Sequence, residues 1–146
     1  MDNNTSFKRL YLAGPLFSES ELDFNKSLKR KLKPYFKIYL PQEDGGHMLT
    51  LIKNGMDPKK VSKDVFNKDI KAINKCDYLL IILNGKLIDE GAAFELGIAY
   101  NLEKICIGLQ TDLRYLYPNY MNPMISNSLS RIFSSIDELV KWAESI

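Results

Sequence analysis

The stretch from residue 76 to residue 100 constrains the fold more than any other part of the chain. It contains an unbroken apolar run from Tyr78 to Leu83. Such a run is typical of a strand that is buried on both faces, as in a parallel sheet. A polar loop and the small residues Gly91-Ala92-Ala93 then lead into an apolar helix, predicted over 92–102. Open α/β sheets build ligand sites where a strand enters a helix through such a turn, at the carboxyl end of the strand.

The same alternation of strand and helix continues along the chain. Strands are expected at 9–13, 36–40, 78–83, 105–109 and 131–133, and helices at 19–33, 57–75, 92–102 and 135–143. We expect a long loop over 42–56 with one helical turn at 49–53, and irregular structure over 111–127. The alternation predicts an α/β fold: a doubly wound, flavodoxin-like, five-stranded parallel sheet of order 2-1-3-4-5, with helices on both faces. The chain has 146 residues, which favours a single domain over 1–146.

Charge and hydropathy argue against several classes of protein. The formal net charge of +2 is too small to indicate binding to nucleic acid or to a membrane surface. The Lys-rich segment 26–33 carries Leu28 and Leu32 at helical spacing, which indicates a solvated helix face, with a weak anion-attracting patch as the alternative. No stretch is apolar for long enough to span a bilayer, and the first residues contain no signal-peptide core. We therefore expect a cytoplasmic protein.

The cysteines and the histidine also limit the chemistry. Cys76 and Cys106 lie far apart in apolar surroundings, which predicts reduced thiols in the core. His47 is the single histidine, which argues against a histidine-based zinc site and against a Ser-His-Asp triad. We expect neither a metal nor a cofactor.

The candidate functional residues gather at one end of the predicted sheet. In the order 2-1-3-4-5, the carboxyl ends of the first and third strands lie side by side. This brings together the loops 14–17 and 84–91 and, by proximity, the long loop after Leu40. Tyr11, Asp69, Asp89 and Glu95 lie on or beside these segments. Their convergence on one end of one sheet is the basis of a site hypothesis.

Each of these side chains has both a functional and a structural interpretation. Glu95 lies in the first turns of its helix, where the helix dipole stabilises an anion by about 0.3–1 kcal/mol, so we expect it to stay ionised. The small residues 91–93 would let a ligand ring approach the backbone. Taken singly, however, Asp89 is a helix cap or turn residue, Asp69 an exposed helix residue, and Tyr11 a core aromatic.

Several motifs resemble one known family. They are Y-L-A-G-P at 11–15, K-D-I at 68–70, C-D at 76–77, D-E-G-A-A-F-E-L-G-I-A at 89–99 and N-P-M-I at 122–125. Together they make the chain, from about Arg9 to Ile125, similar to the nucleoside 2-deoxyribosyltransferases. The resemblance implies transfer of 2-deoxyribose between nucleobases in nucleotide salvage. The substrates would be a deoxynucleoside and a free nucleobase.

The resemblance also implies roles for individual residues. Glu95 would be the nucleophile, forming a covalent glycosyl ester with overall retention of configuration, and Tyr11 would orient it. Asp69 and Asp89 would bind the base, with Asp89 as its proton donor. Asn122 would be lent to a neighbouring subunit to bind the sugar 5'-hydroxyl, which implies a homo-oligomer. The remaining expected substrate-binding residues are Gln42, which matches a base-contacting position, and Gly14, Phe17, Gly91 and Met124.

Two other functions remain open. The first is hydrolysis of nucleoside 5'-monophosphates by a related N-glycosidase. Residues 15–17 of the first loop offer a phosphate nothing beyond backbone N–H groups, although the hydroxyls of Ser18, Ser126 and Ser128 can hold phosphate oxygens. The second is a nucleotide-binding module without catalysis, because one fold hosts many functions. A classical dinucleotide site is not indicated, since no G-x-G-x-x-G motif follows the first strand.

Overall fold

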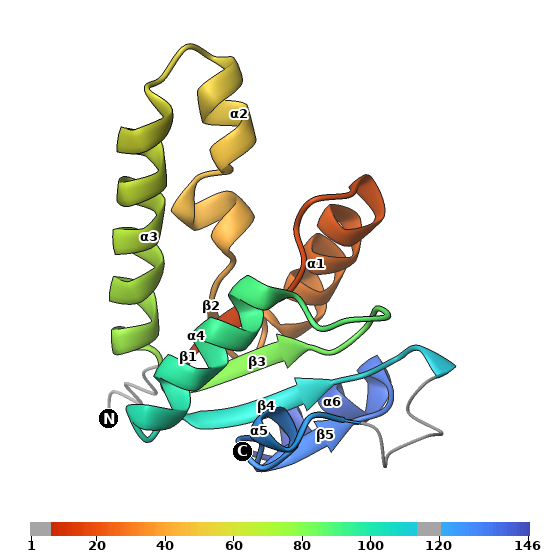
Figure 1. Ribbon diagram of the computed structural model, residues 1–146. Coiled ribbons are helices and arrows are strands. Elements are labelled where there is room, and N and C mark those ends of the chain that lie inside the picture. Colours follow the sequence, from red (N-terminus) through yellow and green to blue (C-terminus); the bar gives the residue numbers. More distant parts are fainter. Residues whose placement is uncertain (1–6, 114–120) are drawn as a thin grey trace, which may run out of the picture.

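A five-stranded parallel sheet forms the centre of the molecule (Figure 1). The computed structural model describes residues 7–113 and 121–146. The strands are β1 (Arg9–Ala13), β2 (Lys37–Tyr39), β3 (Tyr78–Ile82), β4 (Ile105–Leu109) and β5 (Arg131–Phe133). All pair in parallel in the order β2-β1-β3-β4-β5. The predicted strand order and doubly wound arrangement are therefore confirmed.

Helices cover both faces of this sheet. On one face, α1 (Glu19–Leu32) and α6 (Ile136–Glu144) pack against the strands. On the other face lie α3 (Pro58–Lys75), α4 (Glu90–Asn101) and the short α5 (Pro123–Ser126) (Figure 1). Capping residues mark the starts of the two longest helices, α1 and α3. Ser18 and Glu21 form a capping box at α1, and Asp57 caps α3, with a proline in its first turn.

The segment between β2 and α3 differs from the expected loop. A π-helical turn, η1 (Pro41–Gly45), is followed by α2 (Met48–Lys53), and α2 packs against α3 to form a helical hairpin (Figure 1). The glycines of this segment suggested a loop, but Gly46 and Gly55, which have positive φ angles of 91° and 89°, only end the two helices. Gly45 lies within η1. The glycines therefore separate helical turns, where the sequence had indicated irregular chain.

Smaller differences concern α4 and α5. The helix expected from residue 92 begins at Glu90, because Asp89 caps it. Within the segment expected to be irregular, Asn122 caps the four-residue helix α5. Residues 114–120 of that segment lie outside the described part of the chain.

The two faces of the sheet have separate cores. β1 shows the division: Leu10 and Leu12 belong to the core under α1 and α6, and Tyr11 and Ala13 to the core under α3 and α4. This follows from the period of two along a strand. The two cysteines are free and buried, as expected. None of the helices in residues 7–113 and 121–146 combines the length and apolar character needed to cross a bilayer.

Candidate active site

A tyrosine and a glutamate meet where β1 and α4 approach each other. The hydroxyl of Tyr11 donates a hydrogen bond to Oε1 of Glu95, with 2.7 Å between the oxygens. Tyr11 is fully buried in β1, and Glu95 projects from the second turn of α4. β1 pairs directly with β3, which precedes α4, so the strand order itself brings the two side chains together. The other oxygen of Glu95, Oε2, has no hydrogen-bond partner among the described residues.

A second tyrosine–carboxylate pair lies beside the first. The hydroxyl of Tyr39, at the end of β2, donates to Oδ1 of Asp69 on α3 over 2.9 Å. The rings of Tyr39 and Tyr11 stack, with centroids 5.3 Å apart and planes inclined by 17°. The four side chains thus form one connected group drawn from two strands and two helices.

Burial dominates the electrostatics of this group. The pKa of Glu95 rises from 4.5 to about 8, chiefly because burial penalises the charged form. The hydrogen bond from Tyr11 opposes the rise, and the charges of Asp69 and Asp89 add to it. The expectation that the helix dipole keeps Glu95 ionised is therefore wrong. Glu95 lies in the second turn, beyond the reach of most of that dipole.

The pKa of Asp69 is also raised. Burial is again the main cause, and it is partly offset by the hydrogen bond from Tyr39 and by the charge of Lys68. The pKa of Tyr11 moves far upward, because burial and the neighbouring carboxylates both oppose a phenolate. Tyr11 is therefore a permanent hydrogen-bond donor at any physiological pH.

Asp89 has the structural role that its position suggested. Its Oδ2 accepts the backbone N–H of Ala92 over 2.9 Å, which caps α4. Its charge is nevertheless close enough to influence Glu95. Gly91 is exposed at the same turn, and a Cβ there would lie 3.2 Å from Asp89 Oδ2. A side chain at Gly91 would therefore crowd the capping carboxylate of Asp89.

Gln42 turns its amide toward α1. Its Oε1 accepts a hydrogen bond from Asn25 Nδ2 at 2.8 Å, and its Nε2 donates to the carbonyl of Leu22 at 3.1 Å. Asn25 Nδ2 also donates to the carbonyl of Pro15 at 2.9 Å, and its Oδ1 is buried without a partner in the described part of the chain. Asn25 thus ties the first loop to η1. Sequence reasoning missed this role, although an asparagine on an otherwise apolar helix stripe was a visible signal.

The other predicted residues lie at the edges of the group or apart from it. Gly14 is buried, and a Cβ there would approach Ile82 Cδ1 to 2.9 Å, so close packing of β1 on β3 requires glycine. Phe17 is exposed. Asn122 and Met124 lie on α5, where Asn122 Oδ1 accepts the N–H of Met124. Both are exposed, and no hydrogen bond among the described residues connects them to Glu95.

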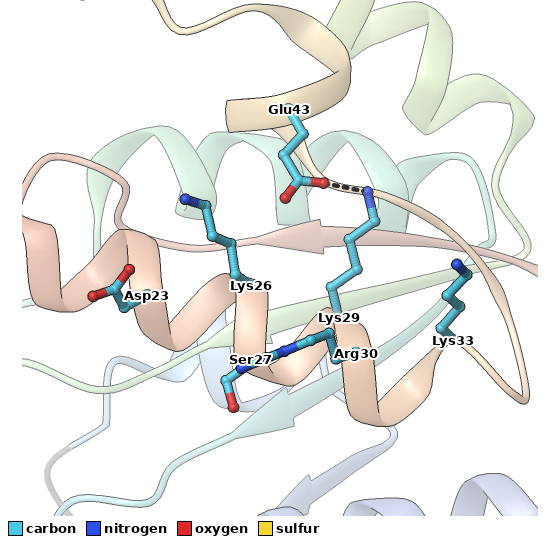
Figure 2. Close-up of a pocket in the computed structure, with 7 residues that line it drawn as sticks. All are labelled: Asp23, Lys26, Ser27, Lys29, Arg30, Lys33 and Glu43. Carbon is cyan, nitrogen blue, oxygen red and sulfur yellow. Dashed lines mark hydrogen bonds and ion pairs between the residues drawn. The ribbon is translucent and has the colours of Figure 1, made fainter.

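The shallow groove along α1 is separate from this group (Figure 2). Its charged and polar lining consists of Asp23, Lys26, Ser27, Lys29, Arg30, Lys33 and Glu43. Lys29 Nζ is paired with Glu43 at 2.6 Å, and Lys26, Arg30 and Lys33 are exposed, as in a solvated helix face. Within the described ranges, no three His, Cys, Asp or Glu side chains are grouped closely enough to hold a metal ion.

The family model of the nucleoside 2-deoxyribosyltransferases matches residues 10–135. The chain belongs to this family. The match includes Tyr11, Asp69 and Glu95 of the group described above. No curated protein is a recognisable sequence relative of the chain.

Solved structures with similar folds include a conserved protein from Enterococcus faecalis V583, with 25% identity over 96% of this chain and 99% of that one, and a TM-score of 0.76. A 2-deoxyribosyltransferase from Bacillus psychrosaccharolyticus is also 25% identical, over 90% of each chain, with a TM-score of 0.75. A CMP N-glycosidase from Clostridium botulinum has 19% identity over 94% of this chain and 98% of that one, with a TM-score of 0.58, and shares the fold. The family and these two named enzymes act on N-glycosidic bonds.

Proposed function

We propose that this protein transfers 2-deoxyribose between nucleobases through a covalent ester on Glu95. One observation carries the proposal: a half-buried carboxyl group has one oxygen held by Tyr11 and the other without a hydrogen-bond partner in residues 7–113 and 121–146. A nucleophile needs this combination of fixed direction and an open lone pair. Family membership supports the choice of a nucleoside as the substrate.

The chemistry is a double displacement. Oε2 of Glu95 attacks the anomeric carbon as the C1'–N bond breaks, and the departing base keeps the bonding electrons and takes up a proton. A nitrogen of the second base then attacks the same carbon, loses its proton, and releases the carboxylate. Two inversions give net retention, as in retaining glycosidases.

The protonation state of Glu95 gives this mechanism a pH dependence. A carboxyl group with a pKa of about 8 carries its proton most of the time at pH 7. Only the ionised form attacks, so kcat/KM should rise with pH until about pH 8. The apolar surroundings that raise the pKa also make the ionised oxygen a stronger nucleophile once it is formed.

Two carboxyl groups are available to exchange a proton with the base. The resemblance favours Asp89, but one oxygen of Asp89 caps α4, whereas Asp69 has a pKa raised by burial. We assign the proton to Asp69 and base binding to both. A 7-methylguanine deoxynucleoside, whose base leaves without protonation, tests the assignment. Loss of release rate in Asp69→Asn should be restored with this substrate, and restoration in Asp89→Asn instead would reverse the two roles.

The first loop favours an unphosphorylated sugar. The backbone N–H groups of Phe17 and Ser18 both donate to Oε2 of Glu21, at 2.9 and 2.8 Å. The donors that a 5'-phosphate would need are therefore occupied by an acidic side chain. This arrangement supports the transferase over a nucleoside 5'-monophosphate N-glycosidase.

We further propose a homo-oligomer with shared sites. The outer side of α4 is apolar: Phe94 is 59% exposed and Leu102 is 38% exposed, on either side of the open Gly97. A second copy would cover this face.

Phe94→Lys should lower the mass measured by light scattering, whereas Met56→Lys, a matched change at another exposed apolar position, should not. Mixing the inactive variants Glu95→Gln and Asn122→Ala should restore activity if Asn122 completes a neighbour's site.

Intact-mass measurement tests the reaction class directly. Incubation with a slow 2'-fluoro deoxynucleoside should add one sugar to the wild-type protein and none to Glu95→Gln, and peptide mapping should place the sugar on Glu95. Turnover of a deoxynucleoside with a free acceptor base should exceed turnover of deoxynucleoside monophosphates alone. Preference for the monophosphates would indicate the glycosidase. Tight binding of an unchanged nucleoside, without an adduct, would indicate a binding module.

A further inference from the structure

Tyr39 connects the two carboxyl groups that the proposed reaction uses. Its hydroxyl is bonded to Asp69, and its ring lies flat against Tyr11, which holds Glu95. Tyr39 lies at the end of β2, the edge strand next to β1, so its position is set by the sheet rather than by a loop.

The turn η1 closes over this contact. Gly45 is buried there, and a Cβ on it would lie 2.6 Å from Asp69 Oδ1 and 2.9 Å from the Tyr39 hydroxyl. Neither distance leaves room for a methyl group. Gly45 does not have a positive φ angle, so backbone strain does not explain the glycine here. The close approach of η1 to the Tyr39–Asp69 hydrogen bond does.

We propose that Tyr39 is a positioning residue that holds the base-binding Asp69 and the nucleophile-holding Tyr11 in one rigid unit; the assignment rests on the proposed function. The two parts of its side chain have separate tasks. The hydroxyl fixes the carboxyl group of Asp69, and the ring fixes the plane of Tyr11. Such support matters because small displacements of reacting groups reduce the rate strongly.

The Tyr39 hydroxyl also adjusts the pKa of Asp69, which has to serve two opposite proton transfers in the proposed reaction. Asp69 must give a proton to the leaving base and take one from the incoming base. Burial raises the pKa of Asp69, while Tyr39 and Lys68 lower it; Glu95 and Tyr11 are the other ionisable groups of the unit. Removing the hydroxyl should raise the pKa of Asp69 further. The step in which Asp69 accepts a proton then becomes slower, and more so at low pH.

The test uses Tyr39→Phe in the full-length protein, with Tyr35→Phe as the matched control. Tyr35 also donates its hydroxyl to a carboxylate, Glu144, over 2.7 Å, but this pair lies at the surface beside α6, on the other face of the sheet from α3 and Asp69. In Tyr39→Phe, transfer to the acceptor base should fall about tenfold at pH 6 and less at pH 8, with release of the first base less affected. Tyr35→Phe should match the wild type. Tyr39→Leu, which also removes the ring, should slow release of the first base as well.

A second measurement does not depend on turnover. In a ¹³C titration, the carboxyl carbon of Asp69 should titrate at higher pH in Tyr39→Phe than in the wild type and in Tyr35→Phe. An unchanged Asp69 titration together with an unchanged acceptor step would overturn the role of Tyr39. A shifted titration in a protein that transfers no sugar would refute the proposed function while leaving the coupling of Tyr39 to Asp69 in place.

Discussion

The two faces of the sheet use aromatic side chains in different ways. Under α1 and α6, the rings of Phe36, Tyr78, Phe133 and Trp142 pack on one another, with centroid separations between 5.3 and 6.2 Å. Under α3 and α4, Tyr11 and Tyr39 stack as a pair, and each hydroxyl is bonded to a carboxyl group. The first cluster stabilises the fold by apolar burial, and the second holds ionisable groups in place.

The neighbouring side chains follow the same division. The core under α1 and α6 is built mainly of leucines and aromatic rings. The opposite core includes the small residues Ala13, Ala92 and Ala99 beside its leucines. Strand β1 contributes side chains to both cores. Side chains that stabilise the fold and the side chain proposed to act in the reaction, Tyr11, therefore lie on opposite faces of the same strand.

The largest expected effect is on the catalytic face. Glu95→Gln keeps the size and shape of the side chain but removes the nucleophile, so sugar transfer should fall about 10³-fold or more. Circular dichroism and the unfolding midpoint should show a folded protein. Near-normal turnover in this variant would mean that Glu95 does not form the covalent bond.

On the structural face, Phe133→Ala should mainly affect stability. Phe133 lies on β5, is fully buried and packs against the ring of Trp142. Loss of such a side chain costs about 3–5 kcal/mol. Urea denaturation should show the loss, while kcat per folded molecule at low temperature should stay close to that of the wild type. A large fall in kcat at unchanged stability would show that the two faces do not divide the tasks in this way.

Gly45→Ala should have an intermediate effect confined to the site. The added methyl group would displace Asp69 Oδ1 or the Tyr39 hydroxyl, and kcat/KM should fall about tenfold. Gly97→Ala is the matched control, because a Cβ at Gly97 meets no atom of its own chain within 4 Å, and light scattering should show that this change leaves any assembly intact. The kcat/KM of Gly45→Ala should lie well below that of Gly97→Ala, while the unfolding midpoints of the two variants should be similar. Equal kinetics would indicate that η1 simply moves aside.

The smallest expected effect is a pH-dependent gain in stability. The pKa of Glu95 is about 8 in the folded protein and 4.5 as its ordinary value, so the folded state holds a proton that the unfolded chain has lost between these values. Stability contributed by the protonated group is complete below pH 4.5 and lost as pH rises through 8. Glu95→Gln should therefore gain stability relative to the wild type progressively from pH 5 to pH 9. Thermal unfolding at both pH values measures it; a constant difference would contradict the raised pKa.

Hydrophobic pattern was enough to predict the architecture. The continuous apolar run of β3, the alternation of strands with helices, and caps such as Ser18 and Asp57 are local signals, and they led to the strand order that the structure confirms. The helical turn expected at 49–53 corresponds to α2, but η1 and the packing of α2 against α3 were not predicted, because glycines that end helices look the same in a sequence as glycines in a loop. Candidate residues at the carboxyl ends of β1 and β3 could be named because the order of a doubly wound sheet places those ends together.

The residue types, their helical and strand periods, and the family motifs are local properties, so the chain alone already specified the fold, the nucleoside-related family and the choice of Glu95. The pKa of Glu95, the attachment of Gln42 to α1, and the link through Tyr39 depend on contacts between segments distant in the chain. Burial and hydrogen bonding across such contacts outweigh the local dipole of one helix. For that reason the ionisation of the site followed from the packing of β1, β2, α3 and α4 around it.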